Sequence, residues 1–223
     1  MKLYIANKNY SSWSMRPGVM LKQAGIAHEE VMVRFDGFDA QSQFKQTLKD
    51  INPVGKVPVL VDDGQAVTQI VAICSYLDGK FPQMGFLPAS GMARAKALEA
   101  FAWMNNTVHP TFTHVFMPHK YSASADVQAD IKAHAVETYR GLMGELQTLV
   151  TDAQARGDAW LAGEHFGPLD AYVLTLTRWG TIAGITPEEH PELWAFVQKV
   201  AAVPAVTRVM ERERLQLNMG KPA

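Results

Sequence analysis

The chain has 223 residues, a formal net charge of −1 and a hydrophobic content of 48%. That apolar content allows one large or two modest domains with a real core, and it excludes a disordered tail. The near-zero charge, without a run of lysines or arginines, argues against nucleic acid and anionic membranes as partners. The first residues lack the apolar stretch of a signal peptide, and no uncharged apolar segment of about 18 residues follows, so we expect a cytoplasmic protein.

The single cysteine, Cys74, lies within the apolar stretch IVAICSYL. It cannot form an internal disulfide, and no Cys/His pair has the spacing of a zinc site, so we expect neither a disulfide framework nor a metal. The apolar neighbours of Cys74 predict a buried and unreactive thiol.

The first part of the chain alternates between strand and helix patterns. KLYIA and HEEVMVRF are typical of strands. Between them, residues 14–24 carry apolar side chains at helical spacing, and Gly25 ends the predicted helix. If the two strands are parallel, this strand-helix-strand unit is right-handed.

A second helical stretch, DAQSQFKQTLKD, precedes the segment INPVGKVPVLVDDGQAV, in which two short strands meet at the tight-turn pair Asp63-Gly64. Residues 69–79 then form a third helix, for which Thr68 is the expected N-cap. The order of these elements predicts a small mixed sheet with helices on its faces, complete by about residue 80.

Strand patterns cease after the Pro/Gly-rich linker KFPQMGFLPASG. We therefore predict an α/β domain at residues 1–81 and an all-helical domain at residues 90–223. The fold class is α/β plus all-α.

The predicted helical domain begins with an apolar stripe over residues 92–117, which includes Asn105 and is interrupted near Pro110. A second long helix is expected over residues 126–155, with Val127 on its inner face. Three shorter helices are expected at residues 168–183, 191–202 and 204–215.

Polar residues gather where the first strand meets the first helix, in the stretch NKNYSSWSMRPG at residues 7–18. Serine is a preferred N-cap, so these hydroxyls alone indicate no more than a capped helix start. A cis bond before Pro58 would leave the backbone N–H and C=O of Val57 open to an extended peptide. The N–H groups of Gln69 and Ile70, at the start of the third helix, could hold a carboxylate.

Together, these features resemble the cytosolic glutathione transferases, and the resemblance extends over essentially the whole chain. The stretch INPVGKVPVLVDDGQAVTQIVAICSYL carries it most specifically. SSWSMR resembles the Ser-Ser-Cys-x-x-Arg pattern of the serine-type, zeta-like members, with Trp13 in place of the cysteine. The resemblance implies a thioredoxin-like, glutathione-binding domain at residues 1–81 and an electrophile pocket contributed by the helical domain, and it disfavours cysteine-based chemistry.

The resemblance also implies the contacts with glutathione. Val57, next to Pro58, would pair with the cysteinyl backbone, and Gln69 with Ile70 would hold the γ-glutamyl end. Lys56 would neutralise the glycyl carboxylate. Glutathione is then a co-substrate rather than a bound cofactor, and a homodimer is expected.

Two positions depart from the family pattern. Ile70 supplies only a backbone N–H where the family usually places Ser or Thr, and the missing hydrogen bond to a carboxylate is worth roughly 1.5 to 3 kcal/mol. In GPLDAYV, Gly167 replaces the usual Ser or Thr cap. We expect Asp170 to keep the reciprocal capping contact, so that this helix still forms.

Ser11 takes the place of the family's catalytic hydroxyl. The thiolate is the nucleophile, and lowering a thiol pKa of ~8.5 by about two units requires roughly 2.7 kcal/mol. A hydroxyl donor to a charged sulfur supplies about 1.5 to 3 kcal/mol and a helix N-terminus about 0.3 to 1 kcal/mol, so no general base is needed. Tyr10, Ser12 and Ser14 stay as alternative donors, and Arg16 is either a surface cation or a charge turned towards the ligand.

The candidates for the electrophile site are Trp13 and the long-helix residues Asn105, Asn106 and His109, although the same residue types are common in ordinary cores. The leading function is a glutathione transferase that activates the thiol for conjugation or isomerisation of a small hydrophobic electrophile, as in detoxification. The alternatives are a zeta-like cis–trans isomerase of an unsaturated diketo acid and a non-catalytic binding or regulatory protein with the same fold.

Overall fold

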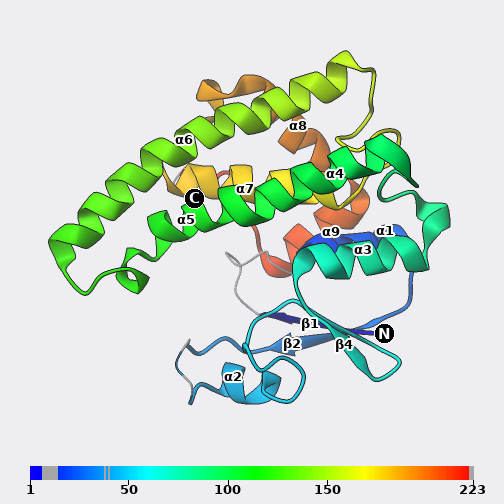
Figure 1. Cartoon of the computed structure of the whole chain (residues 1–223), viewed down its shortest axis with the longest axis horizontal. Helices are drawn as coiled ribbons and strands as arrows, with labels where there is room; N and C mark the ends of the chain where they lie inside the picture. Colours follow the sequence, from blue (N-terminus) through cyan, green and yellow to red (C-terminus); the bar gives the residue numbers. More distant parts are fainter. Residues whose placement is uncertain (7–14, 38, 40, 221–223) are drawn as a thin grey trace. The chain divides into compact units, whose positions relative to one another are not determined.

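The structure is a computed structural model that describes residues 1–6, 15–37, 39 and 41–220 (Figure 1). Its contacts divide the chain into two units. The first contains residues 1–86 together with 203–215, and the second contains residues 87–202 and the chain from residue 216. Residues 203–215, which the sequence pattern placed with the helical part, therefore group with the first unit.

The first unit is built on a four-stranded sheet of order β2-β1-β3-β4. The strands are β1 (Lys2–Ala6), β2 (Glu29–Val33), β3 (Val59–Asp62) and β4 (Gln65–Val67). β1 and β2 are parallel, whereas β1 with β3 and β3 with β4 are antiparallel, so the predicted mixed sheet is confirmed. The turn between β3 and β4 places both Asp63 and Gly64 at positive φ, as the Asp-Gly signal predicts.

Four helices accompany this sheet: α1 (Met15–Gln23), α2 (Gln43–Leu48), α3 (Ile70–Lys80) and α9 (Pro204–Glu213). α1 and α3 cover one face of the sheet and α2 covers the other (Figure 1). Gly25 ends α1 at φ 65°, with its N–H donating to the carbonyl of Lys22 at 3.2 Å, and α9 packs on α1. Cys74 on α3 is fully buried, as predicted.

The described residues of the second unit form helices without a sheet, which confirms the all-helical prediction. The helices are α4 (Gly91–Trp103), α5 (His109–Phe116), α6 (Ala125–Ala155), α7 (Pro168–Ile182) and α8 (Pro191–Ala201), with short 3₁₀ turns at Pro118–Lys120 and Pro187–Glu189. No single helix in the described ranges has both the length and the apolar character to cross a membrane, although consecutive α8 and α9 meet that criterion as a bent pair.

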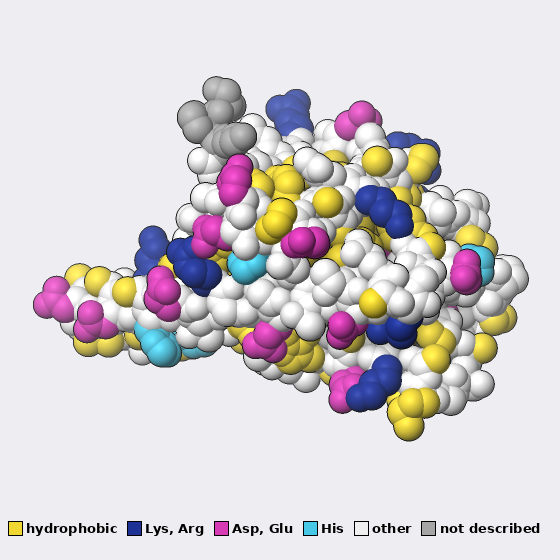
Figure 2. All heavy atoms as spheres, turned by 90° about the horizontal axis from the view of Figure 1, so that it is seen from above, with side chains coloured by type: hydrophobic (Ala, Val, Ile, Leu, Met, Phe, Trp, Pro, Cys, Tyr) yellow, Lys and Arg dark blue, Asp and Glu magenta, His cyan; other side chains and the backbone are white. Residues whose placement is uncertain are grey.

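The interruption predicted near Pro110 is confirmed: it is a π-helical turn at Met104–Val108, after which α5 begins at His109. Two other details of the helical prediction are wrong. The buried stripe passes through Met104 instead of Asn105. Val127 is 45% exposed because α6 begins beyond the part of the unit that covers it. On the face of the molecule that Figure 2 shows, acidic and basic side chains are interspersed.

The start of α7 confirms the predicted role of Asp170. The N–H of Gly167 donates to Oδ2 of Asp170 at 2.8 Å, and the N–H of Leu161 donates to Oδ1 at 2.9 Å. Asp170 is fully buried, and this burial raises the pKa of its carboxyl to about 7 in spite of the two hydrogen bonds that favour the charged form.

Candidate functional site

Three segments of the first unit meet at one end of its sheet. Tyr4 pairs with Val59 across β1 and β3, and Leu60 pairs with Val67 across β3 and β4. Continuing the first register by two residues places Ala6, the end of β1, beside Val57. Continuing the second places Pro58 beside Gln69. The end of β1, the entry to β3 and the start of α3 are therefore neighbours.

β1 ends at Ala6, at this same end of the sheet. The predicted hydroxyl and aromatic residues of the segment that follows, Tyr10, Ser11, Ser12, Trp13 and Ser14, lie outside the described residues. Arg16 is in the first turn of α1, and its side chain is also outside the described part of the structure.

The loop that enters β3 is shaped by the buried side chain of Asn52. Its Nδ2 donates to the carbonyl of Lys56 at 2.7 Å, and its Oδ1 accepts from the N–H of Val54 at 3.2 Å. The Val57-Pro58 bond is cis, Val57 is buried, and Lys56 is exposed. Sequence reasoning missed Asn52, although Asn before Pro is a common start of a side-chain-stabilised turn.

The start of α3 has an unusual backbone. Gln69 is the N-cap, with φ 67° and ψ 122°, so the expected N-cap Thr68 is wrong. A positive φ is uncommon for a residue other than glycine, and strained residues of this kind cluster at binding sites. The side chain of Gln69 is exposed, whereas that of Ile70 is buried with 7% exposure.

In the second unit, the predicted residues Asn105 and His109 are joined by a tyrosine. Nδ1 of His109 lies 2.8 Å from the hydroxyl of Tyr172, and that hydroxyl donates to Oδ1 of Asn105 at 3.4 Å. Nδ2 of Asn105 donates to Oδ1 of the exposed Asn106 at 3.0 Å. Tyr172 lies on α7 and is fully buried, so it fixes how the residues of the π-helical turn are presented.

Aromatic rings surround this polar group. Trp179 meets the His109 ring edge-on at 4.9 Å and stacks on Phe112 at 4.8 Å. Phe112 also stacks on Phe116, at 5.8 Å. Apolar rings around a few hydrogen-bonding groups are typical of sites for small organic molecules.

A separate groove of about 1100 Å³ runs between α4 and the C-terminal half of α6. Its floor includes Ala93, Ala97 and Leu149, and its rim carries charges of both signs. Neither Asn105, Asn106 nor His109 is among the residues that line it. The groove is therefore distinct from the polar group around Tyr172.

Comparisons with known proteins identify relatives of this chain. Residues 10–80 match the family model "Glutathione S-transferase, N-terminal domain". The chain is 31% identical over 219 residues to glutathione S-transferase GST-4.5 of Xanthomonas campestris, an alignment that covers 96% of this chain and all of that protein. It is 27% identical to the maleylacetoacetate isomerase of Pseudomonas aeruginosa, over 92% of this chain and 93% of the relative.

A solved structure gives the same result for the fold. The glutathione S-transferase of a sphingomonad, solved in complex with glutathione, superposes with a TM-score of 0.76 at 28% identity. The superposition covers 97% of this chain and all of that one.

Proposed function

Because the chain belongs to the glutathione S-transferase family, we propose that it binds glutathione at the sheet end where β1, β3 and α3 meet, and activates the bound thiol as the thiolate. The proposal is supported by two backbone features: the cis Val57-Pro58 bond at the entry to β3, and the positive-φ N-cap Gln69 that follows β4, the strand paired with β3. The bend offers a backbone to a peptide, and the helix start offers N–H groups to a carboxylate.

Each end of the tripeptide then has a partner of matching chemistry. The backbone of Val57 pairs with the cysteinyl residue, as in the addition of a strand to a sheet edge. Gln69 and the N–H of Ile70 hold the γ-glutamyl group at the positive end of the α3 dipole. Lys56, which is exposed, neutralises the glycyl carboxylate. Because Ile70 has no hydroxyl, we expect weaker affinity for glutathione than in relatives with Ser or Thr at this position.

Ser11 is the proposed donor to the sulfur. A hydroxyl and the N-terminus of α1 together supply the roughly 2.7 kcal/mol needed to lower the thiol pKa by about two units. Glutathione is a co-substrate here, and the proposed mechanism uses neither a metal nor a cofactor.

The test compares the pH profile of thiol activation in single variants. The pKa of bound glutathione is read from the ultraviolet absorbance of the thiolate, and turnover is measured with 1-chloro-2,4-dinitrobenzene. Ser11→Ala should raise the thiol pKa by one to two units and lower kcat, whereas Ser12→Ala and Ser14→Ala should leave the pKa unchanged. An unchanged profile in Ser11→Ala would transfer the role to Tyr10, Ser12 or Ser14.

The second substrate is proposed to meet the polar group of Asn105, Asn106 and His109 and the aromatic rings beside it. Phe116, which is 42% exposed, offers a ring to a small hydrophobic electrophile, and the polar atoms can orient a carbonyl or nitro group.

A cis–trans isomerase of an unsaturated diketo acid is the second candidate, because a relative whose alignment covers 92% of this chain is named maleylacetoacetate isomerase. The two candidate functions are distinguished by monitoring, with proton NMR, the conversion of a cis-enedione acid to its trans isomer in the presence of catalytic glutathione. Isomerisation without consumption of glutathione supports the isomerase, and formation of a thioether adduct supports conjugation.

We also propose that the protein is a cytoplasmic homodimer. The groove between α4 and α6 carries both Lys96 and Arg156 and the acidic residues Glu99 and Asp152, so the surface can complement a second copy of itself. Sedimentation equilibrium measures the mass directly.

A third candidate function is a non-catalytic binding protein with the same fold. Failure of the monodisperse protein to bind glutathione resin at millimolar ligand would favour this candidate.

A further inference from the structure

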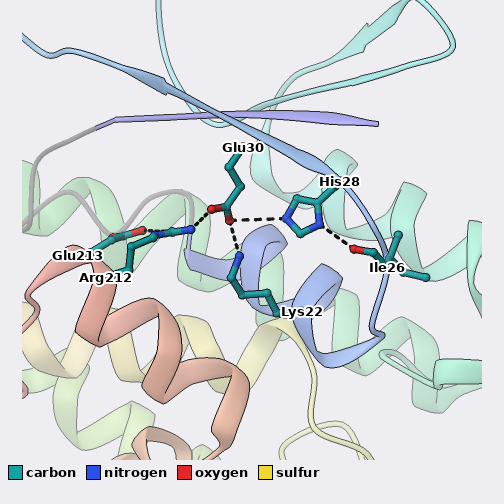
Figure 3. A network of polar contacts seen from close by, with 6 residues as sticks. All are labelled: Lys22, Ile26, His28, Glu30, Arg212 and Glu213. Carbon is teal, nitrogen blue, oxygen red and sulfur yellow. Dashed lines mark hydrogen bonds and ion pairs between the residues drawn. The ribbon is translucent and has the colours of Figure 1, made fainter.

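The carboxylate of Glu30 lies where three elements of the first unit meet (Figure 3). Glu30 belongs to β2, and its Oε1 lies 2.5 Å from Nζ of Lys22 on α1 and 3.5 Å from Nε2 of His28. Its Oε2 is paired with Nη1 of Arg212 on α9. Arg212 also contacts Glu213, with 2.9 Å between Nη2 and Oε1. One carboxylate therefore connects the sheet, the first helix and the last helix.

This cluster is shielded from solvent more than an ordinary surface pair. The side chains of Glu30 and Lys22 are each 21% exposed. The neighbouring pair of Lys2 on β1 and Glu29 on β2 is more than half exposed. Ion pairs that are partly buried are screened less by water and salt, so the contacts of Glu30 matter more than those of Glu29.

The cations of the cluster, Lys22 and Arg212, are faced by the carboxylates of Glu30 and Glu213. Burial and the positive charges of Arg212 and Arg208 lower the pKa of Lys22 to about 8, although the charge of Glu213 raises it; Lys22 is still mostly charged at pH 7. Burial also lowers the pKa of His28, which is therefore mostly neutral at that pH. Without Glu30, the charges of Lys22 and Arg212 would face each other across the α1–α9 contact.

The helix that Glu30 holds is covered on more than one side. Val19, Met20 and Leu21 are consecutive and all at most 1% exposed, which a single neighbouring surface cannot achieve on a helix. A methyl group built on Gly18 would lie 3.7 Å from Leu3 of β1 and 3.9 Å from Oε1 of Glu30. The sheet and Glu30 thus lie against the backbone of α1 on one side, while α9 packs on the same helix.

We propose that Glu30 is a positioning residue for thiol activation: through Lys22, in the last turn of α1, it fixes this helix between the sheet and α9. Because the nine-residue helix moves as one element, the same contact helps to hold its N-terminal end at the glutathione sulfur. The inference rests on the proposed function, in which a hydroxyl and the N-terminus of α1 stabilise the thiolate. The dipole effect falls off within one helical turn, so a small displacement of α1 weakens it.

The experiment compares Glu30→Gln with Glu29→Gln, which makes the same charge change one residue earlier on the same strand. Amide hydrogen exchange reports whether α1 and α9 open, and thiolate absorbance reports the pKa of bound glutathione. In Glu30→Gln we expect exchange in both helices at least tenfold faster than in Glu29→Gln, and a thiol pKa raised by about one unit, which is tenfold less thiolate. Adding Lys22→Met should reverse part of both changes, because it removes one unbalanced cation.

Two outcomes would overturn the proposal. If Glu30→Gln exchanges in α1 and α9 at the same rate as Glu29→Gln, Glu30 does not fix α1 to α9. If Glu30→Gln exchanges faster but the pKa of the bound thiol is unchanged, Glu30 has no positioning role in thiol activation. Should Glu30→Gln fail to fold, Arg212→Met is measured in the same way, because it removes only the α9 side of the contact. Failure of the proposed function would appear separately, as a wild-type protein that does not bind glutathione. Hydrogen exchange would still test whether Glu30 fixes α1 to α9.

Discussion

Glu30 on β2 and Arg212 on α9 form an ion pair although 182 positions separate them in the chain. This ion pair is part of the packing between α9 and α1, in which the apolar side of α9 faces α1. The last helix of the protein thereby belongs to the first unit. The first unit is therefore incomplete without residues that follow the whole helical part.

The first prediction concerns the apolar side of α9. Val206 is fully buried, and Val206→Ala should lower the free energy of unfolding by about 2 to 4 kcal/mol, because it removes packed methyl groups and leaves a cavity. Glu211→Ala, on the exposed side of the same helix, should change it by less than about 0.5 kcal/mol. Urea denaturation followed by circular dichroism measures both values; equal effects would show that α9 contributes little to the first unit.

The second prediction concerns the loop that enters β3. Asn52→Asp keeps the size of the side chain but removes the Nδ2 donor to the carbonyl of Lys56. With this carbonyl no longer held by Asn52, the backbone of Val57 should be fixed less firmly, and the affinity for glutathione should fall by about tenfold. Isothermal titration calorimetry checks this, with Asn218→Asp as the control, because Asn218 lies outside the proposed site and Asp keeps the Oδ1 that accepts from the N–H of Gly220. An affinity equal to that of the control would remove Asn52 from the site.

Most of the fold was predictable because its signals are local. A few adjacent residues are enough to recognise alternating apolar positions, the Asp63-Gly64 turn and Gly25 after the end of α1. The partner of α9 was not predictable, because an amphipathic pattern shows that one face of a helix is covered but not which element covers it. The π-helical turn at Met104–Val108 was missed for a similar reason, since one extra residue per turn leaves no composition signal.

The backbone features of the proposed glutathione site, the cis Val57-Pro58 bond and the helix start near residue 69, were predictable from the sequence. The supporting residues Asn52 and Tyr172 were not predicted. Each acts through a side chain that reaches a segment defined only by the tertiary structure, and an isolated Asn or Tyr has many commoner roles. The positive φ of Gln69 was equally unpredictable, because the residue type argues against it.

The third prediction follows from the pKa of Asp170, which burial raises to about 7. The folded state therefore binds a proton that the unfolded state has already released, and the stability due to this group is present at about pH 4 and decreases as the pH rises to about 7. The slope is at most about 1.4 kcal/mol per pH unit, and it vanishes above pH 7.

Asp170→Asn tests this, since an amide does not titrate. The variant keeps one acceptor for the N–H groups of Leu161 and Gly167, so it should be destabilised but should lack this part of the pH dependence. Denaturant unfolding from pH 4 to pH 8 measures the difference between the two proteins. A difference that stays constant over this range would mean that Asp170 is ionised throughout.

The fourth prediction separates backbone strain from binding at Gln69. Glycine adopts positive φ freely, so Gln69→Gly should stabilise the fold by about 0.5 to 1 kcal/mol, while loss of the side chain weakens glutathione binding by about tenfold. Asp63→Gly is the matched control, because Asp63 also has positive φ but lies in the β3–β4 turn. It should raise the melting temperature similarly and leave the affinity unchanged. If both variants bind glutathione as tightly as the wild type, the strain at Gln69 serves the turn into α3 and not the ligand.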